Sequence, residues 1–198
     1  MSIETKLVEI AENVPKVYEA GKKSEWDFFW DGLQHNGKGT ADYRNMFFYW
    51  SNDIYKPKYP IYSTKTNMSG VFQNARIENT LVDLDFSATT TLTGAFGHCS
   101  KLHTIPKMIV AEQNTWASAF ASCSSLANIT VEGKFGNSVD FSACPLTQAS
   151  LISVIGALSK TATGQTITLN KTAVDNAFNT ATWKSITDGI PNWTFTLI

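Results

Sequence analysis

Phenylalanines recur along the chain at a constant distance. Phe48, Phe72, Phe96 and Phe120 each follow the one before by 24 residues. The same step separates three further pairs, namely Cys99 and Cys123, Leu102 and Leu126, and Ile105 and Ile129. A shortened copy follows, in which Phe141 and Cys144 come 21 residues after Phe120 and Cys123. This self-similarity predicts a fold built of repeated units.

Each unit has the pattern of a turn followed by a strand. The two clearest copies are LTGAFGHCSKLHTIPKMIV from Leu92 and WASAFASCSSLANITVEGKF from Trp116, and looser copies start at Asn45 and Asn67. In this pattern a short turn or helix carries the Phe inward, and the Leu-x-x-Ile stretch runs as a strand with its large residues inward. No unit can bury that face alone, so we expect neighbours to stack about one strand spacing, ~4.8 Å, apart, with Phe on Phe and Cys on Cys.

The period falls within the ~20–29 residues of leucine-rich repeats. We therefore expect an α/β fold, a short solenoid of four to five leucine-rich repeats over residues 45–145. A helical cap over 1–44 and a mixed helix and strand cap over 146–198 complete one continuous domain, because a solenoid leaves an open apolar face at each end.

The first cap region contains two predicted helices. Apolar residues spaced three and four apart predict the first, which either packs on its own domain or forms an oligomerising stalk: Ile3, Leu7, Ile10, Val14 and Val17. Ser24 with Asp27 resembles a helix cap and opens the second, with four large residues on one side: Trp26, Phe29, Trp30 and Leu33. These aromatics either seal the first repeat or form a platform for a carbohydrate or protein.

The second cap region alternates helices and strands. Four apolar residues predict a helical face: Leu151, Ile152, Ile155 and Leu158. Residues 166–169 alternate like a strand, and Thr172 with Asp175 resembles the cap of a following helix. A last helix is expected from Thr180 to Gly189, and a closing strand over 193–198.

Charge and hydrophobicity exclude several partners. The net charge is −1 and the longest basic run is Lys22–Lys23, so nothing favours nucleic acid or anionic lipid. Hydrophobic residues make up 43% and charged residues 17%, a balance typical of a folded domain. Acidic and basic residues interleave with apolar ones over residues 1–12, so we expect no signal peptide, no membrane segment, and synthesis in the cytoplasm.

The cysteines and histidines are the residues that could carry chemistry. Without a leader, an odd count of cysteines favours free thiols for Cys99, Cys123 and Cys144, although stacked repeats leave a disulfide between neighbours geometrically possible. The repeat explains the three cysteines without catalysis, and the equivalent of His98 in the next unit is Ser122. The cluster of His98, Cys99 and His103 matches no zinc template. We expect no catalytic residues, no metal and no cofactor.

Binding is the remaining class of function. Solenoids bind through the exposed strand face, where we place His103 and Asn128, with Lys101 and Lys107 at the margins. The aromatic-rich first unit is the other candidate, with possible anchors at Tyr43, Tyr49, Trp50 and Tyr55. The same aromatics also fit an irregular cap that needs bulk.

The motif Ala-Phe-x-x-Cys-x-x-Leu-x-x-Ile occurs as AFGHCSKLHTI from Ala95 and AFASCSSLANI from Ala119. It resembles the BspA-like leucine-rich repeats of bacterial surface proteins. The tail with ALSKTATGQTITLNKTAVDNAF and NWTFTLI, and the opening NVPKVYEAGKKSEWDFFWDGLQHNG, resemble repeat proteins encoded by phages and prophages of gut Firmicutes.

The resemblance implies a solenoid without catalytic residues, serving adhesion or phage-particle functions. The expected function is non-catalytic recognition of a host protein or cell-surface glycan, as a particle accessory or receptor-binding protein that can be virion-associated. A bacterial cell-surface adhesin fragment and a phage-encoded inhibitor of a host protein are the alternatives. The partner's identity and the oligomeric state do not follow from the sequence.

Overall fold

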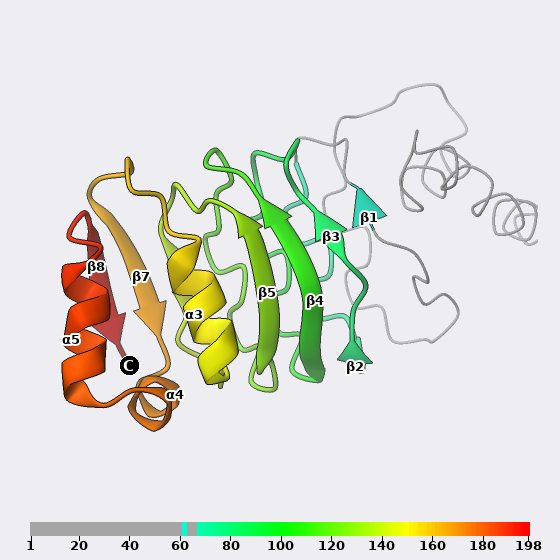
Figure 1. Cartoon of the computed structure of the whole chain (residues 1–198). Helices are drawn as coiled ribbons and strands as arrows, with labels where there is room; N and C mark the ends of the chain where they lie inside the picture. Colours follow the sequence, from blue (N-terminus) through cyan, green and yellow to red (C-terminus); the bar gives the residue numbers. More distant parts are fainter. Residues whose placement is uncertain (1–60, 63–66) are drawn as a thin grey trace, which may run out of the picture.

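A computed structural model of the chain describes residues 61–62 and 67–198, which form three helices and two small parallel sheets (Figure 1). Five strands make up the first sheet: β1 (Ile61–Tyr62), β2 (Asn79–Thr80), β3 (Leu84–Asp85), β4 (Leu102–Val110) and β5 (Asn128–Gly133). The strand β4 is its centre: β2 and β3 pair with the two ends of β4 on one side, and β5 pairs with it on the other. The predicted mixed α/β class is confirmed at this level.

The second sheet and the helices lie in the C-terminal third of the chain. The sheet contains β6 (Val139–Phe141), β7 (Gln165–Leu169) and β8 (Trp193–Leu197), all parallel. The helices are α3 (Gln148–Gly156), α4 (Lys171–Ala177) and α5 (Thr180–Asp188). One continuous core cluster runs through both sheets. The predicted strands over 166–169 and 193–198 and the predicted last helix are therefore present.

Stacked aromatic rings run through that core. The ring centroids of Phe72 and Phe96 lie 5.3 Å apart, those of Phe96 and Phe120 also 5.3 Å apart, and those of Phe120 and Phe141 4.4 Å apart, with interplanar angles of 13°, 9° and 24°. All four side chains are buried. The predicted stacking of phenylalanines from successive units is confirmed for these residues, whereas Phe48 lies outside the described part of the chain.

Main-chain hydrogen bonds link the turns that carry these rings. The N–H of Phe72 donates to the carbonyl of Ala95 (2.8 Å), and the N–H of Phe96 donates to that of Ala119 (2.9 Å). The cysteines follow the same order, since the Sγ of Cys99 lies 3.0 Å from the carbonyl oxygen of Phe72 and the Sγ of Cys123 3.0 Å from that of Phe96. Equivalent atoms of consecutive 24-residue units therefore meet in consecutive layers.

Each turn needs a left-handed residue at two equivalent positions. The first position holds Gly70, Gly94 and Ser118, with φ of 61°, 64° and 53°, and the second holds asparagine, histidine and serine. Serine at the first position is strained because its Cβ crowds the following carbonyl in this region, a cost of about 1–2 kcal/mol.

Ser118→Gly is expected to raise the free energy of unfolding by about 0.5–1 kcal/mol, because glycine removes the strain but adds entropy to the unfolded chain. Urea denaturation would measure the change. The matched control is Ser124→Gly, at an exposed turn position that does not have a positive φ. A loss of stability in Ser118→Gly equal to that of the control would contradict the repeated left-handed geometry.

The helix α3 lies beside β5, where a further strand would otherwise pair (Figure 1). Thr147 caps it, and its serines reach the edge of the sheet: the hydroxyl of Ser150 accepts from the N–H of Ile129 (2.9 Å), and that of Ser153 from the N–H of Val131 (2.8 Å). These bonds satisfy two N–H groups on the outer edge of β5, which would otherwise be free to pair with another strand.

Ser150→Ala is expected to lower the free energy of unfolding by about 1–3 kcal/mol, because it leaves the buried N–H of Ile129 without its acceptor. Thermal or urea unfolding followed by circular dichroism measures this. Ser124→Ala, at an exposed site, should change stability by less than about 0.5 kcal/mol. Equal effects of the two variants would show that the serine does not hold the edge of the sheet.

Two details of the predicted C-terminal region are wrong. Ile152 was expected on the buried helical face, but it is 56% exposed, and Val154 takes the inward position. The helix α4 is capped by Asn170, whose Oδ1 accepts from the N–H of Ala173 (3.0 Å), and not by Thr172. Counted from Leu151, the buried stripe of α3 continues at i+3 and i+4, which are Val154 and Ile155, and Ile152 lies beside this stripe. The cap of α4 differs by two residues, the range within which spacing leaves the start of a short helix undetermined.

Candidate binding site

The exposed surface of β4 and β5 is polar. Ile105 and Ile129 point into the core, whereas the strand residues beside them face outward. We call the following side chains the strand face: His103, Thr104, Pro106, Asn128 and Thr130. Thr104 lies opposite Asn128 in the parallel register, so consecutive layers present their residues side by side. The predicted outward orientation of His103 and Asn128 is confirmed.

The two predicted lysines are charge-compensated by acids from neighbouring strands or the turns beside them. The Nζ of Lys101 lies 2.7 Å from a carboxylate oxygen of Glu78, and that of Lys107 lies 3.0 Å from one of Glu132. These side chains are between 37% and 59% exposed, so the pairs contribute little to stability. The ion pairs instead offset the charges of the two lysines, so the electrostatic potential around the strand face stays close to neutral.

The structure brings together one half of the predicted binding residues. Lys101, His103 and Lys107 lie on or directly before β4, and Asn128 opens β5. The Nδ1 of His103 lies 2.8 Å from the carbonyl oxygen of Lys101, which fixes the ring. The aromatic half of the prediction lies outside the described residues: Tyr43, Tyr49, Trp50 and Tyr55.

A hollow of about 150 Å³, which we call the strand hollow, opens between the strand face and α3. The N–H of Thr147 donates to the carbonyl of Ala127 (2.9 Å), which holds the start of α3 against β5. Its lining contains no charged side chain: Thr104, Ile105, Pro106, Asn128, Ile129, Thr130, Thr147, Ala149 and Ser150.

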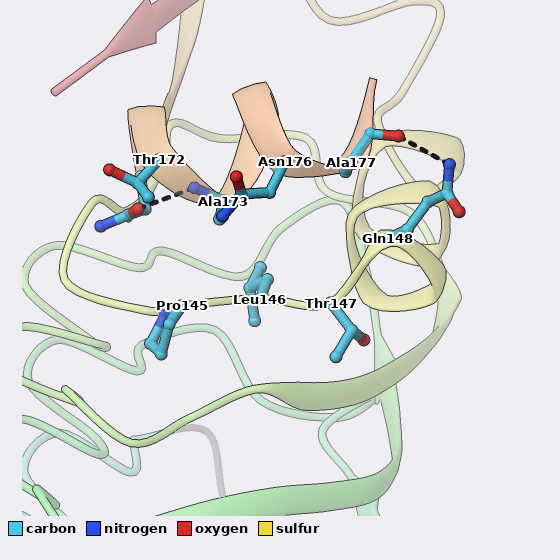
Figure 2. Close-up of a pocket in the computed structure, with 9 residues that line it drawn as sticks. Pro145, Leu146, Thr147, Gln148, Thr172, Ala173, Asn176 and Ala177 are labelled. Carbon is cyan, nitrogen blue, oxygen red and sulfur yellow. Dashed lines mark hydrogen bonds between the residues drawn. The ribbon is translucent and has the colours of Figure 1, made fainter. Parts of the chain in front are cut away.

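A larger hollow of about 240 Å³, the helix hollow, lies between α4 and the segment that leads into α3 (Figure 2). Two hydrogen bonds hold its walls: the Nε2 of Gln148 donates to the carbonyl of Ala177 (2.7 Å), and the Nδ2 of Asn170 donates to that of Ser142 (2.9 Å). The lining is again uncharged: Pro145, Leu146, Thr147, Gln148, Asn170, Thr172, Ala173, Asn176 and Ala177.

The sequence did not identify the residues of the helix hollow as a site. Thr172 and Asn176 are one helical turn apart on α4, and this spacing could have indicated a common face. Their approach to Thr147 and Gln148 depends on the packing of α4 against α3, which no local pattern encodes.

The cysteines are buried among the stacked layers as free thiols. Burial, and next to it the neighbouring Cys123, raise the pKa of the Cys99 thiol far above its ordinary value. For Cys144 the hydrogen bond with Cys123 raises the pKa first, and burial adds to it. These two thiols are protonated at neutral pH, and a protonated thiol is a poor nucleophile.

The candidate metal cluster is divided between the core and the surface. Cys99 is buried, whereas His98 and His103 are exposed. Within residues 67–198 the structure places no three histidine, cysteine, aspartate or glutamate side chains where they could hold one metal ion.

Comparison with known proteins adds no relative, because no family model, curated protein or solved structure matches the chain. Among the helices that the structure describes, none has the length and apolar character needed to cross a membrane.

Proposed function

We propose that the chain is a non-catalytic recognition protein built on a leucine-rich-repeat solenoid of the BspA-like type. The stacked phenylalanines, the ladder between cysteine thiols and phenylalanine carbonyls, and the repeated left-handed turns support the solenoid. Together with the motif around Ala95 and Ala119, they favour the family that the sequence resembles.

One observation carries the recognition function. Consecutive layers present Thr104 and Asn128 side by side on an exposed, nearly neutral face, which continues into the two hollows. Such a surface offers hydrogen bonds along a line, as solenoids use to bind extended partners. The partner we propose is a protein or glycan on the surface of a host bacterium, met by a phage- or prophage-encoded particle protein.

Binding of the fluorescently labelled, purified chain to intact cells of candidate Firmicutes hosts tests this proposal. We expect saturable binding that falls at least about tenfold in affinity when Thr104→Glu and Thr130→Glu together place uncompensated charges on the strand face. The matched control carries Thr163→Glu and Thr182→Glu, two exposed positions away from that face.

Two results would contradict the proposal: no saturable binding to any candidate host, or equal losses in the two double variants. Binding to a purified intracellular host protein, with the cells left unbound, would instead favour the inhibitor function.

A further inference from the structure

The strand hollow and the helix hollow share Thr147 in their walls, so they adjoin at the start of α3. We propose that together they form one groove, which binds a neutral glycan through hydroxyl and amide groups. This inference rests on the proposed recognition function and narrows its partner to a class of ligand. The volumes of the two hollows together fall at the lower end of the range for small-molecule sites, which is about 300–1,000 Å³.

Hydrogen-bonding capacity is concentrated on α4. Thr172 and Asn176 line the helix hollow, are exposed, and make no hydrogen bond through their side chains to the part of the chain that the structure describes. Beside them, Ala173 and Ala177 have small side chains that leave the hollow open, and Figure 2 shows this helix above the segment of Pro145, Leu146 and Thr147. A hydroxyl and an amide offer both donors and acceptors, which is what sugar hydroxyls require.

The rest of the groove is fixed before any ligand arrives. The side-chain amide of Gln148 donates to the carbonyl of Ala177. The side-chain amide of Asn170 accepts from the N–H of Ala173 and donates to the carbonyl of Ser142. The hydroxyl of Thr147 accepts the capping hydrogen bond at the start of α3. Because these groups are already ordered, little further ordering would oppose binding.

Charge and side-chain type separate the possible ligands. Neither hollow contains Lys, Arg, Asp, Glu or His in its lining, so a phosphate backbone, an acidic glycan or a charged peptide would find no opposite charge. The lining also lacks the aromatic and arginine anchors on which protein interfaces depend. Proline, leucine and alanine surfaces between the polar groups match the C–H faces of a neutral sugar.

The test is titration of the full chain with neutral oligosaccharides (hexamers of glucose, mannose, galactose and N-acetylglucosamine) and with heparin and polysialic acid fragments as anionic probes. We expect at least one neutral hexamer to bind. Thr172→Val combined with Asn176→Leu should weaken that binding at least about tenfold, because hydrogen-bond partners are lost while bulk is kept. Thr182→Val, at an exposed position of α5, should leave it unchanged, and circular dichroism should show both variants folded.

The inference is overturned if no neutral hexamer binds, if only the anionic probes bind, or if the α4 double variant binds as well as the parent chain. Cell binding distinguishes this failure from that of the proposed function. If cells are bound through Thr104 and Thr130 but neutral sugars neither bind nor compete, recognition stands and the glycan groove does not. If neither cells nor oligosaccharides are bound, both fail.

Discussion

Replacing Phe120 by alanine is expected to lower the free energy of unfolding by about 3–5 kcal/mol. Phe120 is buried between Phe96 on one side and Phe141 on the other, with centroid distances of 5.3 Å and 4.4 Å, and its ring also stacks on Trp116 at 6.0 Å. Alanine removes the buried apolar surface, the ring contacts and the support of both neighbouring layers at once. Urea unfolding followed by tryptophan fluorescence and circular dichroism measures the loss.

Two comparison variants make this result specific to the column of rings. Phe120→Leu keeps most of the volume and should cost less than about 1.5 kcal/mol. Ile152→Ala shortens an apolar side chain that is 56% exposed, and should cost less than about 1 kcal/mol. If Phe120→Ala were no more harmful than Ile152→Ala, the stacked rings would not be holding the layers together.

Gly133→Ala is expected to destabilise the fold by a similar amount, about 3–5 kcal/mol, through two independent effects. Gly133 ends β5 with φ of +87°, a conformation that side chains with a Cβ rarely adopt. A Cβ there would also lie 2.0 Å from the carbonyl oxygen of Val110, its partner on β4. Since backbone atoms on both strands would have to move, relaxation of one side chain cannot relieve the contact.

Two other glycines separate the effects of strain and contact. Gly164 has φ of +69° with open space around it, so Gly164→Ala should cost only about 1–2 kcal/mol from backbone strain. Gly156 ends α3 without positive φ or close neighbours, so Gly156→Ala should stabilise by up to about 1 kcal/mol. Chemical denaturation of the three variants gives the ranking, and a Gly133→Ala chain as stable as Gly164→Ala would refute the close approach of β4 and β5.

The sequence predicts best those features that depend on a constant period. The 24-residue step places Phe72, Phe96 and Phe120 in one column whatever the details of the turns, because equivalent positions of stacked units meet. The burial of Cys99 and Cys123 follows from the same rule.

Features that depend on contacts between irregular segments were not predictable in this way. The spacing between repeats changes from 24 to 21 residues before Phe141, at the short strand β6, which pairs with β7 in a second sheet. A strand of three residues is too short for an alternating pattern to predict it. In the sequence, the serines of α3 look like ordinary helix residues. Their role as hydrogen-bond acceptors for β5 follows only from the tertiary contact between the two elements.

The candidate site likewise combines features that the sequence predicts with features that depend on tertiary contacts. His103 and Asn128 were placed outward correctly because each lies between the two buried residues of a Leu-x-x-Ile stretch. The ion pairs that neutralise Lys101 and Lys107 join residues 23 and 25 positions apart, and depend on the register between strands. The helix hollow needs α3 and α4 to meet, a tertiary contact that no local pattern contains.

The central proposal is that residues 67–138 form a stack of 24-residue layers, each held by its neighbours. Its most direct test is the free energy of unfolding of a chain in which Leu92–Thr115 is duplicated in tandem, adding one layer in register. The account predicts one cooperative transition, a steeper dependence on urea, and a free energy of unfolding no lower than that of the parent. Loss of cooperative unfolding, or a markedly less stable chain, would contradict it.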